Sequence, residues 1–406
     1  MMSKKSPQLR FEGFTDDWEE RKLGDISYKV KEKNKTGEFT ETLTNSAEYG
    51  IINQRDFFDK DISNAKNLTG YYVVKNDDFV YNPRISNFAP VGPIKRNKLG
   101  RTGVMSPLYY VFRTHDIDKN YFEKYFDTVY WHRFMELNGD SGARADRFAI
   151  KDSVFVEMPI PYPTMDEQQK IGSFFKQLDD TIALHQRKLD LLKEQKKGYL
   201  QKMFPKNGAK VPELRFAGFA EDWEERKLRD LLNKNSEKNK NLSVINVESV
   251  SNKTGFTKQT DQFEDYSVAS ADLSNYYVIR EKQFAYNPSR INVGSIAYKD
   301  LGDEISVVSP LYVSFSTKKV LNDGFLWNWF KTASFDAQRQ RLSEGGVRDT
   351  LSFNQLSEMN TMFPTYPEQE KIGSFFQQLD ETIALHQRKL DLLKEQKKGF
   401  LQKMFV

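Results

Sequence analysis

The stretch TIALHQRKLDLLKEQKKG occurs twice in this chain without a single change, at residues 181–198 and again at 382–399. The identity extends further, because 31 of the 34 residues in 171–204 recur in 372–405. Apolar residues in these segments alternate between spacings of four and three, which is typical of a helix that packs along another helix. The sequence therefore predicts two long helices with nearly identical surfaces.

The predicted contact seam of each helix follows that alternating spacing over ten positions. At about 1.5 Å per residue the helix would form a rod of roughly 48 Å. The other copy is the obvious partner, and an antiparallel pairing would give a coiled coil with a pseudo-twofold arrangement. Leucines beside the seam leave room for helices of another protein. The seam positions are Ile171, Phe175, Leu178, Ile182, His185, Leu189, Leu192, Lys196, Tyr199 and Met203 in the first copy, and Ile372, Phe376, Leu379, Ile383, His386, Leu390, Leu393, Lys397, Phe400 and Met404 in the second.

Two polar features of the helices allow more than one interpretation. His185 and His386 could bind a metal or respond to pH, but a polar layer that sets the register is the simpler reading. Each helix also begins with a capping-box pattern, Thr164 with Glu167 in the first copy and its equivalent in the second.

The helices belong to a longer repeat. The segment PQLRFEGFTDDWEERKLGDI at 7–26 returns as PELRFAGFAEDWEERKLRDL at 212–231. Each half therefore runs from a Trp-containing motif through a variable interior to a long helix, which indicates two whole modules. We expect Trp18 and Trp223 to be core residues. The ends of the modules match closely and the interiors do not, so the ends should do the same task twice.

The interiors mix strand-like runs, at 71–74, 107–112 and 312–315, with helical stretches near 120–137 and 325–342. We therefore predict an α+β fold, with two α/β-mixed domains separated by the long helices as a pseudo-twofold tandem repeat. The predicted segments are a first domain at 1–165, a central helix at 166–204, a second domain at 205–366 and a second helix at 367–406.

Two kinds of loop in each module carry residues that suit contacts with DNA. An Arg beside Asn and Pro on a turn can reach a base edge or a phosphate, as in YNPRISNF at 81–88 and YNPSRINV at 286–293. A Gly-containing polar loop with Arg follows the helical stretch, at 139–147 and 343–350. Ordinary solvated loops would look the same. The candidate residues, including a basic cluster in the first module, are Asn82, Arg84, Lys95, Arg96, Lys98, Arg101, Arg144, Arg147, Asn287, Arg290 and Arg348.

The composition excludes several classes of protein. The 406 residues include no Cys, so disulfides and Cys-based metal sites are excluded, and only four His are present. A net charge of +4 does not suit a polycation that grips DNA without specificity. No apolar run is long enough to span a membrane. The chain lacks a phosphate-binding GxxxxGK[ST] loop and any GxG loop. We expect a cytoplasmic protein that is not an enzyme, with no catalytic residues, no metal site and no cofactor of its own.

The layout resembles the specificity subunit of type I restriction-modification systems. The matching parts are the paired EQxKIGSFF…KGxLQKMF helices, the repeated RFxGFxxDWEERKL starts and the VMSPLY and VVSPLY strands inside the modules. The resemblance covers nearly the whole chain.

That resemblance implies two target-recognition domains, each reading one half of an asymmetric, bipartite site in double-stranded DNA. Two methyltransferase subunits would dock on the helices and supply S-adenosylmethionine and adenine-N6 chemistry. Two restriction and translocation subunits would supply ATP- and Mg-dependent translocation and cleavage. Readers on one face would place the half-sites roughly 34 Å, or about 10 bp, apart. The alternatives are a coiled-coil scaffold whose modules bind proteins, and a stand-alone DNA-modifying enzyme, which the missing cofactor loops disfavour.

Overall fold

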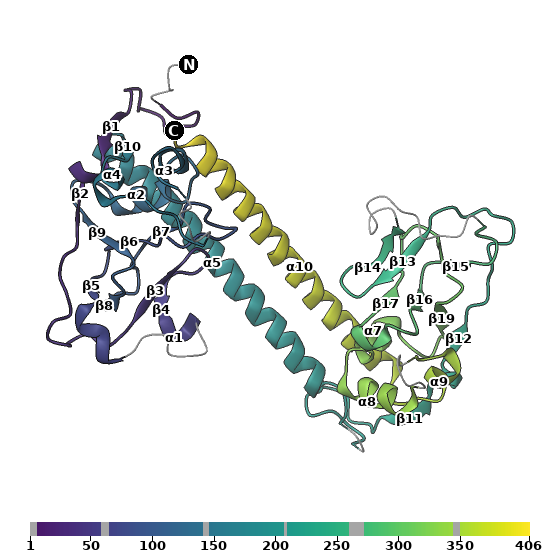
Figure 1. Ribbon diagram of the computed structural model, residues 1–406. Helices are drawn as coiled ribbons and strands as arrows, with labels where there is room; N and C mark the ends of the chain where they lie inside the picture. Colours follow the sequence, from purple (N-terminus) through teal and green to yellow (C-terminus); the bar gives the residue numbers. More distant parts are fainter. Residues whose placement is uncertain (1–5, 58–64, 141–145, 207–208, 260–271, 344–349) are drawn as a thin grey trace. The chain divides into compact units, whose positions relative to one another are not determined.

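The computed structural model describes residues 6–57, 65–140, 146–206, 209–259, 272–343 and 350–406 (Figure 1). The chain forms two compact units, and the long helices contribute to both. The first unit comprises Met1–Gln186 with Arg388–Val406, and the second comprises Arg187–Gln387. Each unit therefore contains one variable module, the start of its own long helix and the end of the other.

The first unit is built around a four-stranded antiparallel sheet with three two-stranded pairs beside it. The sheet has the order β2-β9-β6-β7, and the pairs are β3-β4, β5-β8 and β1-β10. The strands are β1 (Glu19–Lys22), β2 (Ser27–Lys29), β3 (Leu43–Ser46), β4 (Gly50–Asn53), β5 (Tyr72–Val74), β6 (Phe79–Tyr81), β7 (Ile94–Arg96), β8 (Gly103–Met105), β9 (Tyr110–Thr114) and β10 (Pro159–Tyr162). The helices are α1 (Gln54–Phe57), α2 (Lys119–Tyr125), α3 (His132–Asn138), α4 (Asp152–Phe155) and the long α5 (Met165–Lys202), with short 3-10 turns η1 (Leu23–Asp25) and η2 (Ala65–Gly70).

The second unit repeats this plan strand for strand. Its sheet has the order β12-β19-β16-β17, and its pairs are β13-β14, β15-β18 and β11-β20. The strands are β11 (Glu224–Lys227), β12 (Leu232–Lys234), β13 (Glu248–Ser251), β14 (Gly255–Lys258), β15 (Tyr277–Ile279), β16 (Gln283–Tyr286), β17 (Ile296–Tyr298), β18 (Ser306–Val308), β19 (Val313–Thr317) and β20 (Asn360–Phe363). The helices are α7 (Asp323–Trp329), α8 (Ala333–Leu342), α9 (Phe353–Ser357) and the long α10 (Tyr366–Lys403), with turns η3 (Leu228–Asp230) and η4 (Ile291–Val293). The predicted α+β tandem repeat is confirmed.

Each predicted helical stretch is two short helices rather than one. In the first unit the hydroxyl of Thr128 donates to the carbonyl of Tyr125 at 2.6 Å, and in the second that of Thr332 donates to Trp329 at 2.7 Å. Such a side-chain bond competes with the next helical turn. The break lets Tyr130 contact Gln402 of α10 and lets Lys331 contact Asp380 of the same helix.

Aromatic residues join the sheet of each unit to the long helices. In the first unit, Phe79 and Phe112 stack on the sheet at 5.6 Å, and Phe122 of α2 meets Phe79 at 4.9 Å. Trp18 and Phe175 belong to the same buried cluster. Trp223 is buried in the matching cluster of the second unit, so both tryptophans are core residues as predicted.

The helices α5 and α10 pack antiparallel within each unit. In the first unit the start of α5 meets the end of α10, with ring centroids of Phe174 and Phe400 5.0 Å apart. In the second unit the end of α5 meets the start of α10, with Tyr199 and Phe375 also 5.0 Å apart. All twenty predicted seam positions are buried or partly buried.

The repeated Trp-containing motif holds the start of each long helix through a buried ion pair. Arg10 donates two hydrogen bonds to Glu167, at 2.7 and 2.9 Å, and Arg215 makes the same pair with Glu368 at 2.7 and 2.8 Å. The predicted capping box is therefore only half formed. Thr164 accepts from the amide of Glu167, but that carboxylate turns to the arginine, because a bidentate charged pair is stronger than a cap.

The glycine of the repeated IGSFF motif permits close packing. A Cβ at Gly172 would lie 2.8 Å from the amide nitrogen of Tyr121, and one at Gly373 would lie 3.1 Å from that of Phe325. Only glycine therefore allows the first turn of α2, or of α7, to lie against the long helix. No helix among the described residues is long and apolar enough to cross a membrane, and no group of three His, Asp or Glu there could hold a metal ion.

Candidate nucleic-acid interface

The two arginine-bearing loops of the first unit, which are far apart in sequence, lie side by side. Arg84 and Arg147 face each other in an isolated antiparallel bridge. The amide of Phe148 donates to the carbonyl of Pro83 at 2.7 Å, and that of Ile85 donates to Asp146 at 2.9 Å. Both arginines are exposed, and no partner of either guanidinium is found among the described residues. The turn after β6 and the loop after α3 thus present two available cations together.

The asparagine of the same turn has a structural task. The side-chain oxygen of Asn82 accepts from the amide of Arg84 at 3.0 Å, and its side-chain nitrogen donates to the carbonyl of Asn45 at 2.8 Å. The first bond is an Asx turn, which sets the direction of the following residues. Asn82 therefore positions Arg84 against the β3-β4 hairpin, since both polar ends of its side chain are already used.

Phe88 is a residue of this loop that the sequence interpretation missed. Ser86 and Ala89 exchange two backbone hydrogen bonds, at 3.0 and 3.1 Å, so Asn87 and Phe88 form the tip of a tight hairpin. Phe88 is 80% exposed there. An exposed aromatic ring in the same turn as an arginine is a recognised means of contacting bases. The available signal was the aromatic residue within a polar turn.

The second unit has the same turn after β16, with different residues following the asparagine and proline. The side-chain oxygen of Asn287 accepts from the amide of Ser289 at 3.1 Å, and the amide of Leu351 donates to the carbonyl of Pro288 at 3.2 Å. Arg290 is exposed and leads into η4. The remaining predicted arginines, Arg144 and Arg348, lie outside the described residues.

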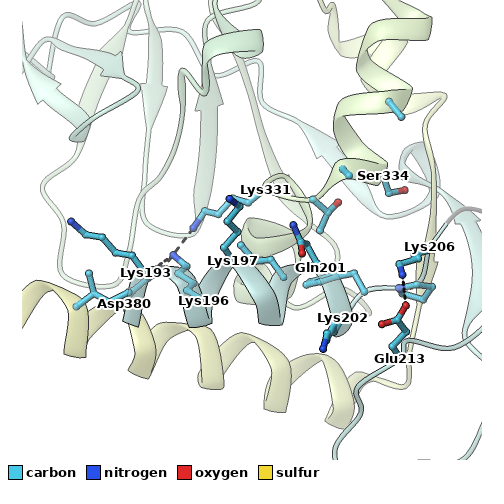
Figure 2. A pocket seen from close by; sticks show the side chains of 17 residues that line it. Lys193, Lys196, Lys197, Gln201, Lys202, Lys206, Glu213, Lys331, Ser334 and Asp380 are labelled. Carbon is cyan, nitrogen blue, oxygen red and sulfur yellow. Dashed lines mark hydrogen bonds and ion pairs between the residues drawn. The ribbon is translucent and has the colours of Figure 1, made fainter. Parts of the chain in front are cut away.

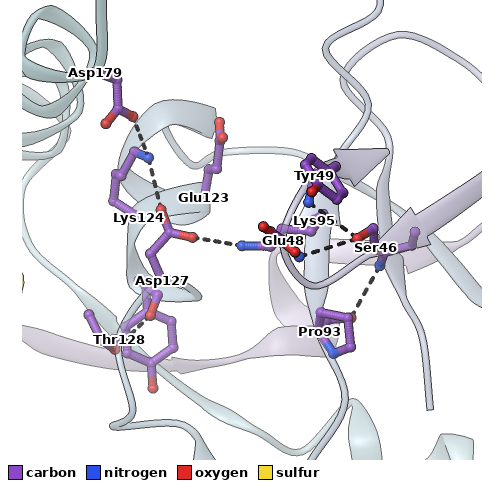
Figure 3. Close-up of polar contacts among 12 residues, drawn as sticks. Ser46, Glu48, Tyr49, Pro93, Lys95, Glu123, Lys124, Asp127, Thr128 and Asp179 are labelled. Atoms are coloured by element: carbon purple, nitrogen blue, oxygen red, sulfur yellow. Dashed lines mark hydrogen bonds and ion pairs between the residues drawn. The ribbon is translucent and has the colours of Figure 1, made fainter. Parts of the chain in front are cut away.

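The predicted basic cluster of the first unit is largely engaged in ion pairs. Lys95 contacts Asp127 at 2.9 Å, within a network that continues through Lys124 to Asp179 (Figure 3). Asp179 also contacts Lys397 at 2.7 Å. Burial of the Lys124 ammonium opposes its charge, but the carboxylates of Asp127 and Asp179 raise its pKa above the usual value. Burial likewise opposes the charge of Asp127, yet Lys124 and Lys95 lower the pKa of its carboxyl. Lys95 is therefore part of the internal structure.

The other three cations of the cluster differ in exposure. Arg96 is nearly buried and contacts Glu123 at 2.8 Å, while Lys98 contacts the same carboxylate at 2.6 Å from an exposed position. Arg101 forms a bidentate pair with Glu41, and its hydrogen bonds lower the pKa of the Glu41 carboxyl. Of these residues, Lys98 and Arg101 retain surface from which to approach a phosphate.

A turn in each unit exposes a leucine at the same place. The SPLY sequence forms a turn in which the amide of Tyr109 donates to Ser106 at 3.1 Å, and Tyr312 donates to Ser309 at 3.0 Å. Leu108 is 59% exposed and Leu311 is 82% exposed. Leu108 lies near the start of the predicted strand at 107–112, and Leu311 directly precedes the one at 312–315. The regular pairing of these strands starts only at Tyr110 and Val313.

The surfaces of α5 and α10 left outside the seam are also partly apolar. The seam residues predicted for partner docking face the interior of the chain's own packing. The leucines beside them are exposed on both helices and offer an apolar face: Leu184, Leu191, Leu385 and Leu392.

Comparison with known proteins gives a family match for each half. The model of the family described as "Type I restriction modification DNA specificity domain" matches residues 15–194 and again residues 220–395. The two matches together span most of the chain.

Individual relatives point the same way. The chain is 25% identical over 331 residues to the type I restriction enzyme MjaIX specificity subunit of Methanocaldococcus jannaschii, covering 76% of this chain and 70% of that protein. It is 20% identical over 271 residues to the MjaVIII specificity subunit of the same organism, covering 62% of each. Its fold is similar to the crystal structure of the type I restriction-modification S subunit from M. genitalium, with a TM-score of 0.60, 13% identity and 99% of each chain covered.

Proposed function

Because the chain belongs to the type I restriction-modification DNA specificity family, we propose that each of its two recognition domains reads one half of a bipartite, asymmetric DNA site. As a specificity subunit the protein is a non-catalytic component of the restriction enzyme. The proposed domains are residues 1–165 and 205–366, with the helices at 166–204 and 367–406 between and after them. The observation that carries the proposal is the pairing of Arg84 with Arg147 on adjoining loops.

The first reading surface, defined here as Arg84, Phe88 and Arg147, has the chemistry for direct base contacts. An arginine can donate two parallel hydrogen bonds to a guanine edge, which is the commonest specific contact in the major groove. The Asx turn of Asn82 and the bridge to Arg147 hold Arg84 in one backbone conformation. Phe88, at the hairpin tip, would contact or partly unstack a neighbouring base.

The remaining cations suit the DNA backbone or the fold. Lys98 and Arg101 keep exposed charge despite their ion pairs and would add phosphate contacts, which strengthen binding without reading sequence. Lys95 and Arg96 would act indirectly, by stabilising the domain. In the second domain we assign the reading role to Arg290, with Asn287 shaping its turn.

The partner subunits follow from the same proposal. Two methyltransferase subunits would dock on α5 and α10, through the exposed leucines rather than through the buried seam, and would carry S-adenosylmethionine. Restriction subunits would carry ATP and Mg. The complex would act in the cytoplasm on double-stranded DNA, with half-sites about one helical turn apart.

The decisive experiment is methylome sequencing of cells that carry this chain with its methyltransferase subunit. Arg84→Ala should relax one base position in one half-site, at a cost of about 1–3 kcal/mol in binding, and Arg84→Lys should not restore it because lysine lacks the bidentate fork. Arg290→Ala is the matched control and should affect only the other half-site.

A second methylome experiment tests the whole domain by exchanging residues 222–366 for the corresponding segment of another specificity subunit. One half of the methylated sequence should change while the other is retained. Altered methylation in both halves, or in neither, would contradict the modular assignment. Normal DNA reading by the Arg84→Ala, Arg147→Ala and Phe88→Ala variants would instead favour protein-binding modules.

A further inference from the structure

The second unit contains a hollow of about 1050 Å³ that has no use in DNA reading as proposed above. It lies between the last turns of α5, the segment that follows α5, and the first turn of α8 (Figure 2). All of its lining residues belong to the second unit. Its volume is near the upper end of the range for small-ligand sites, about 300–1000 Å³.

The hollow has a large excess of positive charge. Six lysines and two carboxylates line it. One carboxylate, Glu213, is paired with Lys206. The other, Asp380, is shared by Lys196 and Lys331, the latter at 3.9 Å. Figure 2 shows Lys196 and Lys331 close together at one end of the hollow, where both ammonium groups share the Asp380 carboxylate.

The crowding of positive charge affects the pKa of Lys331. Burial, followed by repulsion from Lys196, lowers the pKa of its ammonium to about 7, although 30% of its side chain is still accessible. A bound anion would relieve this repulsion, because a negative charge nearby favours the protonated form.

The first turn of α8 adds donors to the same place. Thr332 caps this ten-residue helix by accepting from the amide of Phe335 at 3.3 Å. Ala333 and Ser334 precede that bond in the first turn and line the hollow, and their amides have no partner within the helix. A helix start of this kind attracts phosphate through its amides and its dipole.

The other side of the hollow is apolar. Leu200, Phe204 and Ile383 line it together with small residues of α8. An inorganic anion alone would leave this apolar side of the hollow exposed to water. A ligand that combines phosphates with an apolar or aromatic body would use both halves of the lining.

The matched place of the first unit is a smaller hollow of about 660 Å³, lined by Tyr130 and Gln402 among others. Tyr130 follows Thr128 by two residues, as Ser334 follows Thr332, and its hydroxyl donates to the carbonyl of Gln402 at 2.7 Å. Asp127 stands where the second unit has Lys331. A larger side chain and a negative charge therefore stand where the second unit has Ser334 and Lys331.

We propose that the hollow of the second unit binds a di- or triphosphate joined to an apolar or aromatic body, the chemistry of a nucleotide. The phosphates lie between Lys196, Lys331 and the start of α8. The body covers Leu200 and Phe204. Duplex DNA fits less well, because its backbone would present charge to the apolar half of the lining.

The test is isothermal titration of the full chain at pH 7 and low salt with ADP and with inorganic pyrophosphate. ADP should bind with one site per chain, and at least fivefold more tightly than pyrophosphate, because only ADP covers the apolar side. Ser334→Tyr copies the residue of the first unit into the hollow and should weaken ADP at least tenfold. Lys331→Met should weaken both probes at least tenfold.

The matched control is Tyr130→Phe in the first unit, which should leave ADP affinity unchanged. Absence of saturable ADP binding, equal binding by Ser334→Tyr, or a loss of duplex DNA affinity in Ser334→Tyr without any ADP site would each overturn the proposal. Circular dichroism and the melting temperature of each variant separate misfolding from loss of the site; if Ser334→Tyr is misfolded, Lys197→Met decides in its place. None of these measurements depends on whether Arg84 reads DNA, so this proposal can fail while the proposed function holds.

Discussion

The two units place different charges at one matched position beside helices that are almost the same. In the first unit Asp127 joins Lys124 and Asp179 in a network with alternating charges. In the second unit the matched residues are Lys331 and Asn328, and Lys331 stands next to another lysine. The helices are conserved between the halves because they pack on each other, while the adjoining turn is free to differ. At this position the difference between the halves is therefore electrostatic and local, and it lies on a common frame.

The strongest test of the common frame is to truncate the same aromatic residue in both units. Phe175 and Phe376 are each fully buried, one in each core. Phe175→Ala and Phe376→Ala should each lower the free energy of unfolding by about 3–5 kcal/mol, because both leave a large cavity. Urea unfolding combined with hydrogen exchange would assign each loss to its own unit. A difference of more than about 2 kcal/mol between the two would mean that the repeated helices do not pack equivalently.

The next largest effect should come from the Asp127 network of the first unit. Asp127→Asn removes a carboxylate from between Lys124 and Lys95 and should cost about 2–4 kcal/mol. Adding Lys124→Asn, which copies Asn328, should recover part of that loss in a double-mutant cycle.

The same network predicts an acid dependence. Cations lower the pKa of Asp127 and of Asp179 in the folded state, so their stabilisation is present above the ordinary carboxyl pKa of about 4. It is lost as the pH falls through that value toward the folded pKa. The gap between wild type and Asp127→Asn in denaturant titrations should therefore narrow below about pH 4. A gap that stays constant down to pH 2 would show that packing, not charge, is responsible.

The smallest expected effect is a gain in folding stability rather than a loss. Lys331→Met removes an ammonium whose folded pKa is about 7, below the ordinary value for lysine. The unfolded state binds more protons between that pH and about 10, so the stability of the wild type should rise with pH over this window. At pH 6 the variant should be more stable by roughly 1 kcal/mol, a small figure because the side chain is partly solvated. Thermal melts at pH 6 and pH 9.5 measure it, and an advantage that persists at pH 9.5 would argue against this cause.

The parts of this fold that depend on local periodicity could be predicted from the sequence. The seam from Ile171 to Met203 is visible as a pattern of apolar spacing, and burial of one helical face follows from it directly. The break at Thr128 was missed because a hydroxyl that bonds to the backbone leaves no trace in that pattern.

The candidate site was harder to predict because its key contacts join distant residues. Arg84 and Arg147 were both singled out, but nothing local indicates that they share a bridge. Lys95 looks like a free cation in sequence, and only the fold brings Asp127 to it. Glu167 likewise resembles a helix cap until Arg10 is placed beside it.

The division of the chain between the units has a consequence for synthesis. The second unit is one uninterrupted segment, 187–387, whereas the first needs 388–406 to complete the core around Trp18 and Phe405. A growing chain can therefore finish its second unit while the first still exposes an open apolar face. The half made first is the half that matures last, so a nascent chain that stalls before residue 388 presents an unfinished surface to chaperones and proteases.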